Sequence, residues 1–83
     1  MYTYQPEGVC SKLINFDIQN GVIKQVSFIG GCPGNLQGIS RLVEGMTPND
    51  AIARLEGIRC GGKLTSCPDQ FAKALKQALA EQS

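Results

Sequence analysis

The stretch LINFDIQNGVIKQVSFI, residues 13–29, decides the fold, because two apolar-rich runs flank the dipeptide Asn20-Gly21. Asn-Gly between such runs is the strongest short-range signal for a β-hairpin. The apolar pattern then selects the register. A two-residue loop, which pairs Gln19 with Val22, scatters the apolar side chains over both faces, whereas a three-residue loop that pairs Ile18 with Val22 gathers them on one. We predict the second register, with an inward face made of Ile14, Phe16, Ile18, Val22, Val26 and Phe28.

The remaining pattern predicts a third strand and three helices. Tyr2 and Tyr4 alternate with polar residues, which is typical of a short strand over residues 1–5. Helical periodicity covers residues 33–44, 48–56 and 68–80, with Thr47 as the N-cap of the second helix and Gly45 and Gly57 as stop signals after the first two. Residues 58–66 are expected to form a loop, or a short strand over residues 58–60. The first helix is expected to bury a stripe made of Leu36, Ile39, Leu42 and Val43. We predict one α+β domain over residues 1–83, an antiparallel sheet of two or three strands covered by three helices.

The charge balance excludes several classes of partner. Eight basic and seven acidic residues give a formal net charge of +1, without a run of either sign. Such a chain lacks the electrostatic signature of nucleic-acid or anionic-membrane binding. The N-terminus has no basic and apolar segments of a secretory signal, so a cytoplasmic location is expected. Histidine is absent, which excludes Ser-His-Asp and Cys-His catalysis within one chain.

The four cysteines are the residues with the most chemical potential. Cys32 and Cys67 each precede a proline that opens a predicted helix, which places both cysteines at or next to an N-cap. The positive end of a helix favours a thiolate. Cys10 and Cys60 have glycines nearby instead. In the predicted hairpin Cys10 lies opposite Gly30, which makes it a diagonal neighbour of Cys32. Residues that are distant in the sequence are thus expected to meet.

Three interpretations of the cysteines compete. The first is a metal site with Cys10, Cys32, Cys60 and Cys67 as ligands, most plausibly structural zinc, with an iron–sulfur cluster as the variant. The intervening gaps of 21, 27 and 6 residues do not form the paired CxxC motifs of typical zinc sites. The second is a redox pair of Cys60 and Cys67, and the third is four buried small hydrophobes. We favour the metal site, because all four cysteines lie beside glycine, proline or a helix start.

A glycine-rich turn between the second strand and the first helix also resembles an anion cradle. Gly30, Gly31, Gly34 and Asn35 would offer backbone N–H groups to a nucleotide phosphate at the start of a helix. The stretch matches neither GxGxxG nor a P-loop. We therefore favour a tight strand-to-helix turn over nucleotide binding.

Thr65, Ser66, Cys67, Pro68 and Asp69 spell the name of a protein family. The chain resembles the TSCPD domain family, in particular its small stand-alone branch with four cysteines. The resemblance also rests on Cys10, the Asn-Gly hairpin, residues 30–35 and Cys60-Gly61, so it covers essentially the whole chain. A domain of this family also occurs at the C-terminus of adenosylcobalamin-dependent ribonucleotide reductases.

The resemblance implies an accessory role in ribonucleotide metabolism. Its kinship suggests a ribonucleoside-diphosphate reductase label, but 83 residues cannot hold the large barrel which that catalysis needs. What carries over is a small module that binds metal, relays reducing equivalents or contacts a nucleotide beside such an enzyme. The partners expected are a ribonucleotide reductase, a nucleotide or a second copy, since a thin core and an exposed edge strand favour a homodimer.

Overall fold

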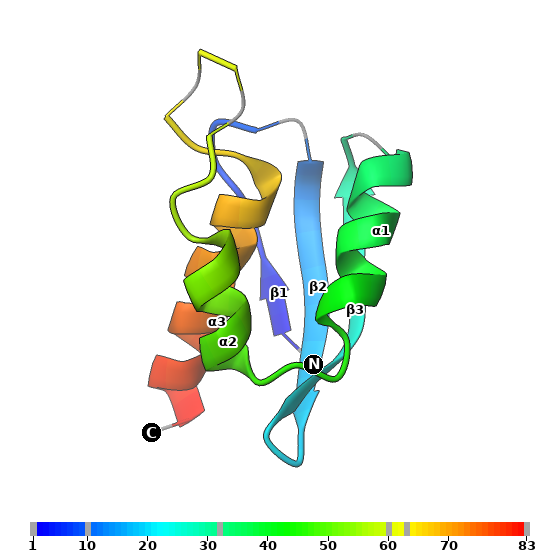
Figure 1. Cartoon of the computed structure of the whole chain (residues 1–83), viewed down its shortest axis with the longest axis vertical. Coiled ribbons are helices and arrows are strands. Elements are labelled where there is room, and N and C mark those ends of the chain that lie inside the picture. Colours follow the sequence, from blue (N-terminus) through cyan, green and yellow to red (C-terminus); the bar gives the residue numbers. More distant parts are fainter. Residues whose placement is uncertain (1, 10, 32, 60, 63, 83) are drawn as a thin grey trace.

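The chain forms a three-stranded antiparallel sheet with three helices, in agreement with the predicted α+β fold (Figure 1). The computed structural model describes residues 2–9, 11–31, 33–59, 61–62 and 64–82. The strand order is β1-β2-β3. The elements are β1 (Tyr2–Tyr4), β2 (Ser11–Gln19), β3 (Val22–Gly30), α1 (Pro33–Val43), α2 (Pro48–Leu55) and α3 (Cys67–Gln82).

The hairpin turn has two residues, so the predicted three-residue loop is wrong. Gln19 pairs with Val22, and both Asn20 (φ 54°) and Gly21 (φ 78°) are left-handed. Two positive φ values at the centre of a two-residue hairpin loop define a type I′ turn. The twist of this turn matches that of the strands, and Asn-Gly is its preferred sequence. Ile23 therefore takes the core position that the prediction gave to Val22.

A β-bulge reconciles this turn with an apolar inner face. Gln25 is left-handed (φ 55°), and β3 carries an extra residue between the pairs Asp17–Lys24 and Asn15–Ser27. The bulge shifts the register by one residue, so Ile14 pairs with Phe28. An uninterrupted ladder could not have combined the two-residue turn with this pairing, and this is why the predicted register failed.

The other end of the hairpin is also irregular. The register shifts again between Ser11 and Leu13, and Gly30 pairs with Ser11. The sequence had placed Cys10 opposite Gly30, one residue out of step with this pairing. Cys10 and Cys32 themselves lie outside the described residues, so their proximity stays a prediction.

The helix ends follow their predicted signals. The Thr47 hydroxyl accepts a hydrogen bond of 3.3 Å from the Asp50 amide at the start of α2. Gly45 and Gly57 follow α1 and α2 with φ of +88°, the left-handed conformation that ends many helices. Within the described part of the connection between α2 and α3 there is no strand, so this segment is the loop that we expected as one of two alternatives.

The core lies between one face of the sheet and the helices. Phe71 of α3 is fully buried and meets Phe16 and Phe28 edge-on, with ring centroids 5.5 and 5.7 Å apart. Helix α1 packs on β3, α3 packs on β2, and α2 packs on α3. Ten buried residues form the cluster: Ile14, Phe16, Ile23, Val26, Val43, Ala51, Phe71, Ala74, Leu75 and Ala78.

Leu42 is the clearest exception to the predicted core. The sequence placed it on the buried stripe of α1, but its side chain is 77% exposed. Leu36 and Val43 are buried and Ile39 is partly buried, so the inward face of α1 is narrower than its apolar pattern.

No helix among the described residues is both long and apolar enough to cross a membrane.

Candidate functional site

Cys67 is the one predicted metal ligand within the described residues, and it lies inside the protein. It is the first residue of α3, and Ser66 precedes it as the N-cap. The prediction that Cys67 lies at or next to an N-cap is therefore confirmed. Its side chain is 9% exposed, and its Sγ atom lies 3.1 Å from Oγ of Ser11 at the start of β2. The sulfur thus contacts the residue that follows Cys10 in the sequence.

Ser11 also joins the segment that leads to Cys32. A Cβ atom added at Gly31 would lie 3.3 Å from the Ser11 amide nitrogen and 2.8 Å from Cδ1 of Leu36. Gly31 therefore packs directly against the start of β2, and Leu36 of α1 covers it. Ser11, which follows Cys10, therefore lies against both Cys67 and Gly31, the residue before Cys32.

The segment that carries Cys60 reaches the same place. The Ser66 hydroxyl donates a 2.6 Å hydrogen bond to the carbonyl of Ile58, two residues before Cys60. On the other side, the position of a Cβ atom at Gly8 is 3.4 Å from Cγ2 of Thr65. Figure 1 shows the β1–β2 connection, the start of α1, the α2–α3 connection and the start of α3 at one end of the molecule.

The described neighbours of Cys10 and Cys60 thus contact the start of α3, and Gly31, before Cys32, is joined to it through Ser11. Cys10, Cys32 and Cys60 lie outside the described residues, so their distances to Cys67 remain a prediction. Within the described residues, no three cysteine, aspartate or glutamate side chains are arranged to hold a metal ion.

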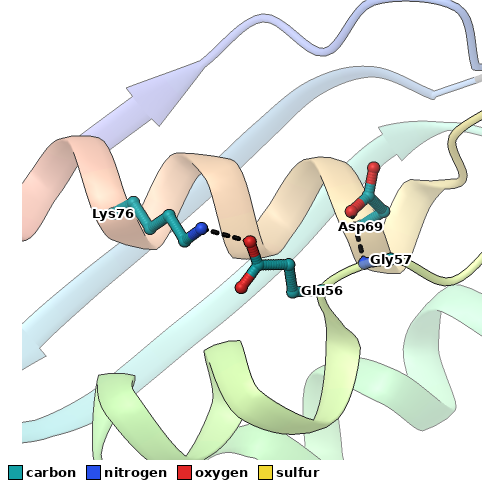
Figure 2. Close-up of polar contacts among 4 residues, drawn as sticks. All are labelled: Glu56, Gly57, Asp69 and Lys76. Atoms are coloured by element: carbon teal, nitrogen blue, oxygen red, sulfur yellow. Dashed lines mark hydrogen bonds and ion pairs between the residues drawn. The ribbon is translucent and has the colours of Figure 1, made fainter.

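Asp69 anchors the start of α3 to the end of α2. Its side chain is 6% exposed, and its carboxylate accepts hydrogen bonds from the Gly57 amide, at 2.7 Å, and from the Thr65 hydroxyl. Figure 2 shows the contact with Gly57, beside the exposed ion pair of Lys76 and Glu56. The bond from Thr65, followed by that from Gly57, lowers the pKa of the Asp69 carboxyl below its ordinary value, although burial opposes the shift.

Gln70 ties the same helix start to the β1–β2 connection. Its side-chain oxygen accepts a 3.1 Å hydrogen bond from the Glu7 amide, and its Nε2 donates to Oγ1 of Thr65 at 2.9 Å. The Ser66 hydroxyl accepts from the Asp69 amide at 3.1 Å. These bonds join the segment around Cys67 to the segment that precedes Cys10.

The predicted anion cradle has a packing explanation. Gly30 and Gly31 have φ of +82° and +81°, which favours glycine at both positions. A Cβ atom at Gly31 would also force the side chain of Leu36 to move. Gly34 and Asn35 are exposed in the first turn of α1. This geometry agrees with a tight strand-to-helix turn, and nucleotide binding there stays a prediction.

Sequence reasoning missed the polar network of Thr65, Asp69, Gln70 and Gly57. One signal was present, because Ser66-Cys67-Pro68-Asp69 has the Ser-x-x-Asp spacing of a helix capping box. The Ser66 hydroxyl forms the expected cap, but the Asp69 carboxylate binds Thr65 and Gly57 instead of the N-cap amide. No local pattern indicates these more distant partners.

A comparison of the sequence with protein families assigns the chain to one of them. The family model of the TSCPD domain matches residues 2–79, nearly the whole chain. The chain belongs to the TSCPD domain family. No curated protein and no solved structure matches it. In this TSCPD domain, four of the five residues of the motif make side-chain contacts. Thr65 and Asp69 bind each other, Ser66 caps α3 and Cys67 contacts β2.

Proposed function

We propose that this TSCPD domain is a small accessory binding module in which Cys10, Cys32, Cys60 and Cys67 hold one structural zinc ion. The observation that carries the proposal is the chain of contacts that joins four separate segments at one end of the domain: Ser11 contacts both Cys67 and Gly31, and Ser66 binds Ile58. Each of these segments contains one cysteine within two residues of a described contact. A chain of this size gains from such a cross-link, because its hydrophobic core is small.

The donor set suits zinc. Zinc binds four thiolates in a closed tetrahedral site and needs no histidine, which this chain lacks. Metal binding at scattered positions stabilises the folded state, since the unfolded chain does not preform the site. The polar network around Asp69 would then position Cys67 before the metal arrives.

The surroundings of Cys67 suit a sulfur that binds a metal ion. The residue opens a helix of 16 residues, whose free N–H groups and dipole stabilise a negative charge at this end. The Ser11 hydroxyl lies at hydrogen-bond distance from the sulfur and can donate to it when the sulfur is bound to a metal ion. Hydrogen bonds of this kind commonly support metal ligands and fix their orientation.

The proposed zinc module fits the kinship with ribonucleotide reductase C-terminal domains as a binding unit, not as a catalyst. A structural metal would hold together the end of the domain where the loops and helix starts lie. A partner enzyme or nucleotide would then contact a surface of fixed shape. The metal supplies rigidity here, and no reaction step is assigned to it.

Elemental analysis of untagged protein tests the proposal directly. We expect about one zinc per chain, and each of the four Cys→Ser variants is expected to lower the zinc content and zinc affinity at least tenfold. Ala72→Ser is the matched control for Cys67→Ser: it places a hydroxyl at another buried position of α3, but it should leave the zinc content unchanged. Less than half an equivalent of any metal, with all four thiols freely titratable, would reject the site.

The same variants separate zinc from the two alternatives. Iron in the analysis together with visible absorption would indicate the iron–sulfur variant. A redox pair of Cys60 and Cys67 would make Cys10→Ser and Cys32→Ser harmless, and oxidised glutathione would convert the pair reversibly to a disulfide. Requirement for all four cysteines is the result that only a four-ligand site predicts.

A further inference from the structure

Leu42 borders an open groove on the helical side of the protein. Its side chain is 77% exposed, which is unusual for a leucine that the helical pattern places with the core residues. The groove has a volume of about 410 Å³ and lies between the end of α1 and α2. Its apolar lining includes Leu42, Met46, Ala51 and Leu55. A projecting apolar side chain and an apolar hollow therefore occupy the same face.

Two opposite charges border the same groove. Asp50 and Arg54 of α2 both line it, and they are one helical turn apart. When two α2 helices lie antiparallel about a twofold axis that passes midway between Asp50 and Arg54, Asp50 of one copy comes opposite Arg54 of the other. In that arrangement the charges of this face complement those of an identical face.

We propose that this face binds a second copy of the chain in a symmetric dimer. A twofold interface uses the same patch on both subunits, so a projection and a hollow on one patch fill each other reciprocally. Leu42 of each copy enters the groove of the other, beside Met46 and Leu55. The charge pairs of Asp50 and Arg54 at the rim fix the antiparallel orientation. This inference does not depend on the proposed zinc site.

Analytical ultracentrifugation of the purified full-length chain tests the dimer. We expect a concentration-dependent monomer–dimer equilibrium, and Leu42→Asp should raise the dissociation constant at least about tenfold because it places a charge in an apolar contact. Leu64→Asp is the matched control: Leu64 is also an exposed leucine, at 82%, but it does not line the groove and should leave the equilibrium unchanged. Circular dichroism of both variants checks that each remains folded.

Charge reversal distinguishes this face from any other dimer. Asp50→Arg and Arg54→Asp should each weaken the dimer, because each creates two like-charge contacts across the twofold axis. The double variant restores opposite charges and should recover most of the affinity. A chain that is monomeric at all concentrations overturns the proposal. So does a dimer that Leu42→Asp leaves intact, or a double variant that is no better than the single ones.

Discussion

Replacing Asp69 by asparagine tests the role of the polar network most sharply. The wild-type carboxylate accepts one hydrogen bond from the Gly57 amide and one from the Thr65 hydroxyl, and it is almost fully buried. A hydrogen bond to a charged group contributes about 1.5–3 kcal/mol to stability, and a neutral one about 0.5–1.5. Asparagine has the same shape but keeps one acceptor oxygen. We therefore expect the free energy of unfolding to fall by about 2–3 kcal/mol at pH 7.

The effect of this change should depend on pH in a defined direction. The pKa of Asp69 is lower in the folded chain than in the unfolded chain, where it is about 3.9. The stabilisation is then fully present above pH ~4 and is lost as the pH falls through the folded pKa. Asparagine does not titrate, so the difference between wild type and Asp69→Asn should shrink from pH 6 to pH 3.

Urea unfolding followed by circular dichroism measures both effects. Glu44→Gln serves as the control, since Glu44 is an exposed carboxylate just after α1, outside the proposed dimer groove, and its loss should change the free energy of unfolding by less than about 0.5 kcal/mol. A difference between wild type and Asp69→Asn below about 0.5 kcal/mol at pH 7 would refute the anchoring role. A larger difference that is constant with pH would show that the carboxylate charge is not its source.

Two backbone predictions accompany it, both measured by the same unfolding assay. Gly31→Ala should lower the free energy of unfolding by about 2 kcal/mol or more, because φ is positive there and the added Cβ would come too close to Leu36. The control Gly38→Ala has open space within α1, so it should raise the free energy of unfolding by about 0.5–1 kcal/mol. Equal effects would contradict the packing described at Gly31. Gln25→Gly should stabilise the chain by up to about 1 kcal/mol by relieving the left-handed bulge residue, and Lys24→Gly beside it should destabilise it by about as much. Destabilisation by Gln25→Gly would argue against the bulge.

The fold was predictable wherever a signal lies within a few residues. Asn20-Gly21 marked the hairpin, Thr47 capped α2, and Gly45 and Gly57 ended two helices, all as expected. The register was not predictable in the same way. It depends on a bulge at Gln25, and a glutamine in the left-handed region has no sequence signature.

The candidate site likewise contains local features that the sequence predicts and distant contacts that it does not. The helix start at Cys67 followed from the proline after it, whereas the contacts of Cys67 with Ser11 and of Asp69 with Gly57 join residues that are far apart in the sequence. Such contacts depend on how α3 packs against β2 and α2, which periodicity does not specify. The prediction that Leu42 is buried failed for a related reason. An apolar residue on a helical stripe is buried only if another element covers it.

The coordination of metal in the purified protein is the most direct test of the central claim, that four separate segments bring their cysteines to one ion. X-ray absorption at the zinc edge measures the ligand type and the bond length. We predict four sulfur ligands at about 2.3 Å and no nitrogen or oxygen ligand. A first shell dominated by oxygen or nitrogen, or fewer than three sulfurs per zinc, would contradict the proposed site.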